Sequence, residues 1–189
     1  MHDLESVAEE LRRVRSGPSA KEAPPVLSRF DAQVEGSPAA YVERLRSVLQ
    51  VALELAGTAE FDDSDLPEED LPAWFRAIGS GGSEKAPEFS LTGMRCYLEL
   101  KGAAEWDVQE WLYRFDPEEY SRGWAWWDAT CEGPSQVRIW VDAWGESFFG
   151  CDELRWLAFT AGATSVQGPE LSRTEEWVAS SGGGIPGKA

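Results

Sequence analysis

Three carboxylates lie in or beside the tryptophan-rich part of the sequence, where they suggest the chemistry of glycosidic bond hydrolysis. They are Asp128, Asp142 and Glu146, within a segment from residue 106 to 156 that contains eight of the ten tryptophans. A glycosidase uses two carboxyl groups flanking the scissile bond, and aromatic rings beside them can stack on the sugar. Among 34 acidic residues, however, some must fall near tryptophans by chance, and no spacing selects a pair. We therefore assign no catalytic residue.

The residues required for nucleophilic catalysis or for a metal centre are also missing. The single histidine is His2, at the terminus, so we expect neither a Ser-His-Asp arrangement nor a histidine zinc site inside the fold. Residues 145–150 (GESFFG) nearly match a nucleophile elbow, but the second glycine comes one residue late. The acidic stretch 60–70 fails the EF-hand pattern, because counting from Asp63 places Glu68 where glycine is required. We expect no metal and no cofactor.

Phosphate-binding loops and cysteine-based sites are likewise unsupported. No GxxxxGK[ST] or GxGxxG motif follows a predicted strand, and the glycine-rich residues 79–82 are followed by an acidic segment. The cysteines Cys96, Cys131 and Cys151 are odd in number, widely spaced and not arranged as CxxC pairs. This pattern argues against a disulfide framework and a zinc ribbon, and is typical of free thiols.

Tryptophan provides the second kind of candidate site residue, because its large ring and single N–H donor serve both cores and interfaces. Inward periodicity assigns Trp111, Trp126 and Trp156 to the core. The candidate binding residues are Trp124, Trp127, Trp140, Asp142, Trp144 and Glu146. The face that carries Trp140, Asp142 and Trp144 is the critical one. If it is open, the protein has a binding site there; if helices cover it, the aromatic residues serve only packing.

The net charge of −17 restricts the class of partner. A nucleic-acid-binding protein needs a basic surface that displaces counterions from phosphates, and this chain would repel a polyanion. Strong negative charge is explained either by solubility or by complementarity to a basic protein. We expect no nucleic acid and no membrane, because no apolar run approaches the roughly 18 residues needed to span a bilayer. The N-terminus lacks an apolar signal region, so we place the protein in the cytoplasm.

The N-terminal part of the chain, residues 1–88, is predicted to be helical. Apolar residues at helical spacing predict helices over 4–14, 38–57 and 71–78, the second with Ser37 as its N-cap. Proline and small residues predict a surface loop over 18–36, and residues 79–88 form a flexible connector. The acids before the third helix are interpreted as capping and solvation.

The C-terminal part, residues 89–171, is predicted to combine strands with one helix. Alternation predicts a strand over 94–100, and we choose a strand for 106–115, where helical spacing competes with aromatic richness. Turn residues 132–135 predict a hairpin between 122–131 and 136–144. A helix over about 151–162, a short edge strand over 164–167 and a flexible tail over 172–189 complete the chain. The fold class is α+β, with N-terminal helices packed against a mainly antiparallel sheet of about 3–5 strands in one shared core.

Two functional hypotheses remain. The first is a non-enzymatic acidic binding protein of the immunity, antitoxin or inhibitor type, which docks a basic partner through the tryptophan hairpin. The alternative is a small-ligand or carbohydrate-binding protein, extending to a carboxylate-dependent hydrolase, in which Trp140 or Trp144 stacks on the ligand. The sequence leaves the partner, the ligand and the oligomeric state open.

Overall fold

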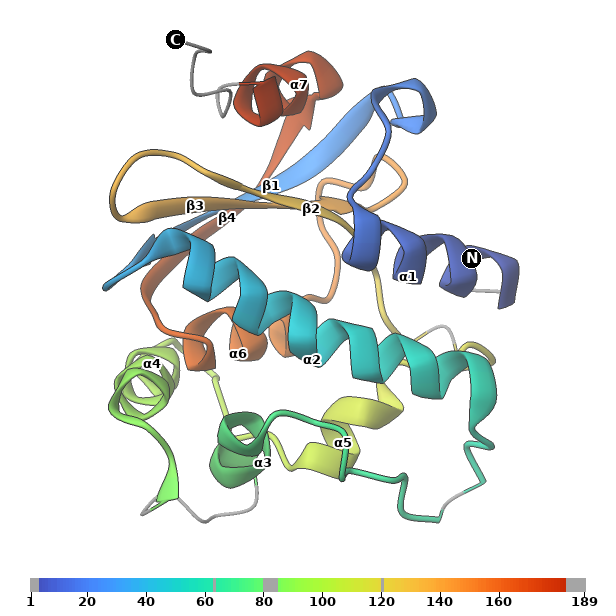
Figure 1. Ribbon diagram of the computed structural model, residues 1–189, viewed down its shortest axis with the longest axis vertical. Coiled ribbons are helices and arrows are strands. Elements are labelled where there is room, and N and C mark those ends of the chain that lie inside the picture. Colours follow the sequence, from blue (N-terminus) through green and yellow to red (C-terminus); the bar gives the residue numbers. More distant parts are fainter. Residues whose placement is uncertain (1–3, 63, 80–84, 120, 183–189) are drawn as a thin grey trace, which may run out of the picture.

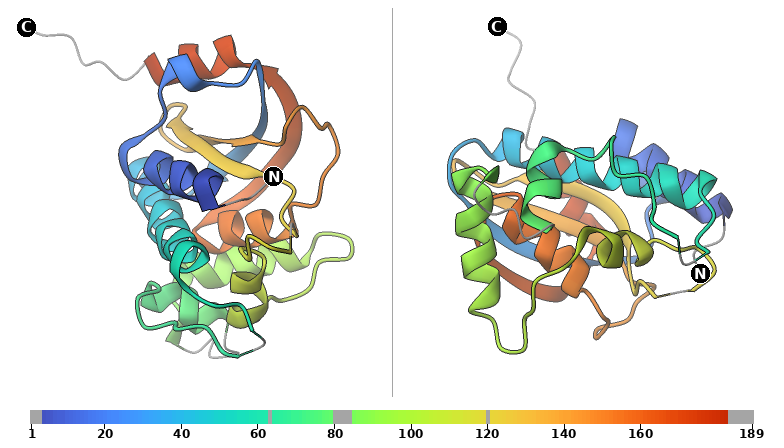
Figure 2. Two further views of the ribbon diagram at one scale, coloured as in Figure 1. Left: turned by 90° about the vertical axis from the view of Figure 1, so that its right-hand side faces the viewer. Right: turned by 90° about the horizontal axis from the view of Figure 1, so that it is seen from below.

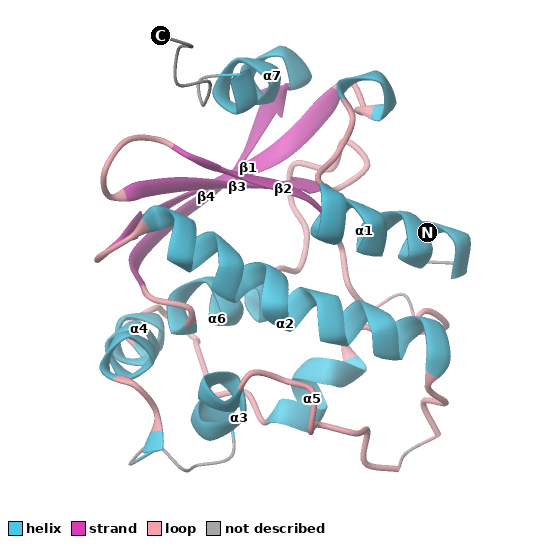
Figure 3. Cartoon of the chain, viewed as in Figure 1, coloured by secondary structure: helices cyan, strands magenta, loops and turns pink. Residues whose placement is uncertain are grey.

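A four-stranded antiparallel sheet divides the molecule into two unequal sides (Figures 1 and 3). The computed structural model describes residues 4–62, 64–79, 85–119 and 121–182. The strands β1 (Val26–Val34), β2 (Ala125–Cys131), β3 (Gln136–Asp142) and β4 (Ala163–Arg173) are ordered β2-β3-β1-β4. Figure 1 shows α7 (Thr174–Gly182) on one side of the sheet. The other helices lie on the opposite side or beside the sheet, which confirms the α+β class.

The best-defined sequence patterns form the expected helices. α1 (Leu4–Ser16), α2 (Pro38–Thr58) and α6 (Asp152–Thr160) confirm three predicted helices. At the start of α2 the Ser37 side chain accepts a hydrogen bond from the Ala40 N–H at 3.3 Å. Ser37 thus satisfies one of the amide groups that the first helical turn leaves unbonded. α3 (Ala73–Gly79) overlaps the helix predicted over 71–78 and ends one residue later.

Two segments predicted as strands are helices in the structure. Residues 94–100 belong largely to α4 (Glu88–Leu98), and residues 106–115 contain α5 (Val108–Tyr113). The Asp107 carboxylate caps α5 by accepting the Gln109 N–H at 2.8 Å, so the helical spacing was the correct signal there. α4 packs directly on α6, because Gly93 has no side chain. A Cβ at that position would lie 1.7 Å from the Phe159 carbonyl oxygen.

The sheet also takes residues from segments that were predicted to be irregular. The predicted loop 18–36 contains the short 3-10 helix η1 (Ala20–Glu22) and β1, a central strand of the sheet. The predicted edge strand 164–167 is part of the longer β4. Residues 172–182 of the expected tail form the end of β4 and then α7, and residues 183–189 lie outside the described chain. The expected connector 79–88 lies partly outside it as well.

One large hydrophobic cluster contains residues from both halves of the sequence. It fills the space between the sheet and α2 and α6, and includes Leu45, Leu49, Trp126, Ile139 and Leu157. The hairpin β2–β3, predicted from its turn residues, carries Trp126 and Ile139 into this core. None of the helices in the described part of the chain is long and apolar enough to cross a membrane.

Candidate functional site

Trp124 is a core residue rather than a surface residue. Its side chain is fully buried, and its Nε1 donates a hydrogen bond to the Glu153 Oε1 at 2.6 Å. The Arg122 guanidinium lies over the Trp124 ring, 4.8 Å from the ring centre. Burial raises the pKa of Glu153, because the charged carboxylate is poorly solvated there. The expectation that Trp124 is exposed is therefore wrong, since it helps to seat α6 against the chain leading into β2.

Trp127 and Trp140 are also covered, although they lie on the face of the sheet away from the main core. They form a second small cluster with Leu27 and Trp177, and Trp127 meets Trp177 edge to face at 5.6 Å. The Trp140 Nε1 donates to the Thr130 Oγ1 at 3.0 Å. The helix α7, through Trp177, closes this face, so the expected exposure of both side chains is corrected.

Asp128 holds α7 in this position. Its Oδ2 accepts the Trp177 Nε1 at 3.0 Å, and its Oδ1 accepts the Arg46 guanidinium at 3.3 Å. Burial raises the pKa of Asp128, while the bonds from Trp177 and Arg46 act in the opposite direction. Both carboxylate oxygens thus have structural partners.

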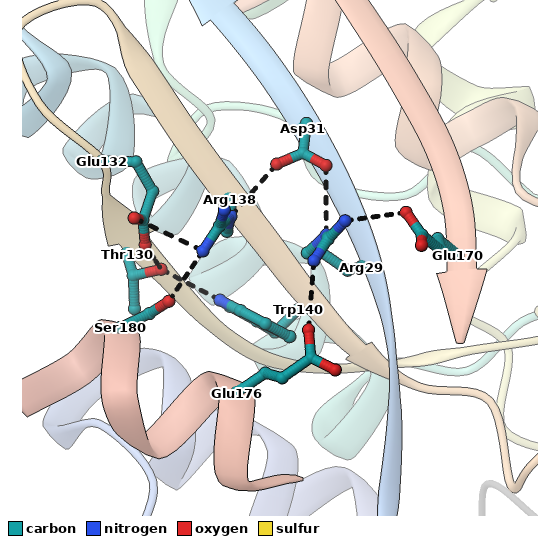
Figure 4. Close-up of polar contacts among 9 residues, drawn as sticks. All are labelled: Arg29, Asp31, Thr130, Glu132, Arg138, Trp140, Glu170, Glu176 and Ser180. Carbon is teal, nitrogen blue, oxygen red and sulfur yellow. Dashed lines mark hydrogen bonds and ion pairs between the residues drawn. The ribbon is translucent and has the colours of Figure 1, made fainter. Parts of the chain in front are cut away.

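A network of charged side chains surrounds this cluster on β1, β3 and β4 (Figure 4). Arg29 bonds Asp31 at 3.1 Å, and from α7 Glu176 bonds Arg29 at 3.3 Å. Arg138 bonds Asp31 at 3.2 Å and the Ser180 hydroxyl at 3.0 Å. These contacts tie α7 to the sheet on both sides of Trp177. They explain why the tryptophan face is closed.

The other three predicted binding residues, Asp142, Trp144 and Glu146, lie at the start of an exposed loop. The Asp142 Oδ1 accepts the Trp144 N–H at 2.8 Å, and the Glu146 N–H donates to the Ala143 carbonyl at 2.9 Å. The backbone of Trp144 has a φ of +52°, a conformation that is unusual for an aromatic residue. The side chain of Trp144 is 48% exposed. The local hydrogen bonds thus fix a turn that presents a tryptophan to solvent.

Sequence reasoning missed Phe148 in the same loop. Its side chain is 91% exposed, the highest value among the large apolar residues of the described chain. The adjacent Phe149 packs edge to face on Phe30 at 6.4 Å and fastens the loop to the core. The sequence signal for an exposed aromatic residue was the pair Phe148-Phe149 at the end of a loop. Neighbouring side chains often point in different directions, so one of the two can pack on the core while the other faces solvent. We call residues 142–148 the aromatic loop.

A small acidic pocket lies on the side from which the aromatic loop projects. In both views of Figure 2 the loops after β3 and after α4 extend from the same side of the molecule. The pocket has a volume of about 200 Å³, and its lining includes Tyr97, Glu105, Trp106, Glu110 and Asp152. The Trp106 Nε1 donates to the Tyr97 hydroxyl at 3.3 Å. Lys101 and Arg155 line an adjoining pocket of about 280 Å³.

The described residues contain no group of three or more histidine, cysteine or acidic side chains arranged to hold a metal ion. Comparisons with protein-family models, with curated proteins and with solved structures gave no match. Any functional inference must therefore come from the geometry of the site itself.

Proposed function

We propose that this protein is a non-enzymatic acidic binding protein, of the immunity, antitoxin or inhibitor type, that docks a basic protein partner through the aromatic loop. The observation that carries this proposal is the exposure of Trp144 and Phe148 on a loop whose turn is fixed by Asp142. Protein interfaces are enriched in aromatic residues, and tryptophan is among the residue types that most often form their hot spots. Because the loop is already ordered, little conformational entropy would be lost on binding.

The charge around the loop supports a basic partner. Asp142 and Glu146 lie within the loop, and the nearby pocket adds further carboxylates. Several arginines are paired with carboxylates of the same chain, among them Arg29, Arg122 and Arg138, each within 3.4 Å of a carboxylate oxygen. The net charge of −17 is therefore carried largely by exposed acids. Such a field steers a basic protein toward the surface and increases its association rate at low salt.

The carbohydrate-binding alternative has less support. Trp140, one of the two rings assigned to stacking, is buried beneath α7. Asp128, one of the carboxylates considered for hydrolysis, bonds Trp177 and Arg46 through its two oxygens. Of the two tryptophans assigned to stacking on a ligand, Trp144 is the one whose ring is exposed.

A quantitative pull-down tests the proposal. The full chain is immobilised and exposed to extract of its native host at low salt, beside the variants Trp144→Ala and Phe148→Ala. We expect a basic protein whose recovery falls by at least about tenfold with either variant, because truncating a hot-spot side chain typically costs 2 kcal/mol or more. The recovery should also fall as the salt concentration rises.

The matched control is Val178→Ala, which truncates an exposed apolar side chain on α7, away from the aromatic loop. This variant should recover the partner as well as the wild type does. If no captured protein depends on Trp144 or Phe148, the aromatic loop is not the docking surface and the proposal fails.

A further inference from the structure

The strand β2 forms one edge of the sheet, and part of its backbone points away from β3. At the hairpin the Glu132 N–H donates to the Gln136 carbonyl at 2.7 Å, which makes these residues a hydrogen-bonded pair. In an antiparallel ladder such pairs alternate with pairs whose backbone groups face outward. From the register Thr130↔Arg138 and Cys131↔Val137, Thr130 faces β3 and Cys131 faces the open edge. Ala129 faces the same edge as Cys131.

The other end of this edge is closed by α1. The Glu10 Oε1 accepts the Trp126 N–H at 2.6 Å, and the Arg13 Nε donates to the Trp126 carbonyl at 3.0 Å. A carboxylate and a guanidinium thus occupy the positions that the carbonyl and N–H of a neighbouring strand would take. Covering an edge in this way prevents unwanted strand pairing. These side-chain contacts from α1 reach Trp126 and end before Ala129.

Beyond α1 the same edge opens into a pocket with a volume of about 510 Å³. Ala129 and Cys131 line one wall, and Ser180 and Ser181 of α7 line another. The Nε of Arg46, which also lines the pocket, is buried and has no hydrogen-bond partner among the described residues. A buried donor without a partner is costly, and an incoming acceptor would relieve that cost.

We propose that this open edge of β2 binds an extended segment of another polypeptide by strand addition. The edge offers the outward carbonyl of Ala129 and the outward N–H and carbonyl of Cys131, which match the alternating groups of an extended chain, whereas the Ala129 N–H already bonds the Asp128 carboxylate. Arg46 lines the same pocket. The lining includes small residues from the chain after α1 and from α7, namely Gly17, Ala20 and Ser181, so the pocket has room for larger side chains on the segment where it faces these residues. This site is separate from the aromatic loop.

Selection from a phage-displayed library of random seven-residue peptides tests the inference on the full chain. We expect enriched peptides that carry larger side chains at alternate positions, because only alternate side chains of an extended segment face the pocket. In hydrogen exchange with such a peptide, the Cys131 amide should slow by about tenfold or more, because it gains a hydrogen bond. The Thr130 amide already faces β3 and should not change, which makes it an internal control.

Two variants separate backbone from side-chain effects. Cys131→Pro removes the outward N–H but leaves the β2–β3 ladder intact, since proline is tolerated where the N–H faces solvent. It should weaken peptide binding by at least about tenfold, whereas Cys131→Ser, which keeps the N–H, should not. Arg46→Lys keeps the charge opposite Asp128 but removes Nε, and should weaken binding by a factor of about three to ten.

The proposal is overturned if the library yields no binder, or if the enriched peptides bind Cys131→Pro as tightly as the wild type. If Cys131→Pro does not fold, as judged by circular dichroism, the proposal is tested by hydrogen exchange of the Cys131 amide and by peptide binding to the Arg46→Lys variant. Peptide binding should be unaffected by Trp144→Ala. The failure of strand addition at β2 can therefore be distinguished from the failure of partner docking at the aromatic loop.

Discussion

Substitution of Glu10, on the N-terminal helix α1, should lower the free energy of unfolding strongly. Its carboxylate is fully buried and accepts two hydrogen bonds from the Arg122 guanidinium, at 2.7 and 2.8 Å. It also accepts the Trp126 N–H at 2.6 Å. The Glu10→Ala variant would remove the carboxylate that the buried Arg122 guanidinium and the buried Trp126 N–H share.

The expected cost follows from these contacts. Removing one partner of a buried ion pair costs about 3–5 kcal/mol, because the remaining charge is poorly solvated. The Arg122 guanidinium stays in contact with the Phe115 and Trp124 rings, 4.3 and 4.8 Å from their centres, which offsets part of that cost. We therefore expect a loss of about 4 kcal/mol in the free energy of unfolding. With a urea slope of about 2 kcal/mol/M, the midpoint should fall by about 2 M.

Urea denaturation followed by tryptophan fluorescence measures this change. Glu9→Ala is the matched control, because Glu9 is exposed and its ion pair with Arg12 contributes less than about 1 kcal/mol. The double variant Glu10→Gln/Arg122→Met removes both charges and keeps an acceptor for Trp126. It should be about 2 kcal/mol more stable than Glu10→Ala. A loss below about 1 kcal/mol for Glu10→Ala would refute the assignment of α1 as an anchored helix.

Three further perturbations test other parts of the structure. Gly93→Ala should cost about 3 kcal/mol in thermal or urea unfolding, because its Cβ would collide with the Phe159 carbonyl, whereas Gly57→Ala, which meets nothing within 4 Å, should be neutral or stabilising. Burial raises the pKa of Glu153, so the folded state binds its proton more readily than the unfolded chain does, and this residue's contribution to stability should improve as pH falls through the raised pKa. Glu153→Gln should remove that contribution, so the wild type should gain stability relative to the variant on acidification, as measured by urea titration from neutral to acidic pH; a constant difference would contradict it. Trp144→Asn should change the free energy of unfolding by less than about 1 kcal/mol, because asparagine tolerates a positive φ, yet reduce partner capture by at least about tenfold.

Elements with strong local signals were predicted correctly. α2 begins at a serine cap followed by proline, and the β2–β3 hairpin surrounds the turn residues 132–135. Capping bonds and turn dihedrals involve residues only a few positions apart, so the sequence contains the interaction as well as the residues. The helix α5 had the same kind of signal in Asp107, but its aromatic residues were given more weight.

Elements whose identity depends on distant partners were not predicted. The segment that contains β1 looked like a loop because of its proline and small residues, yet within β1 Arg29 and Asp31 find partners on β3, β4 and α7. α4 looked like a strand because its apolar residues alternate, and its helical packing against α6 requires Gly93. In each case the stabilising contact lies far away along the chain.

The same division applies to the candidate site. By itself, the sequence determined the acidic charge, the clustering of tryptophans, the presence of a single histidine and the local turn chemistry of the hairpin. Only the tertiary structure decided which aromatic side chains meet solvent. Trp140 is covered by Trp177, which follows it by 37 positions, while Trp144 and Phe148 remain exposed. Hydrogen bonds in turns and caps are local, whereas burial is decided by whichever segment packs over a residue.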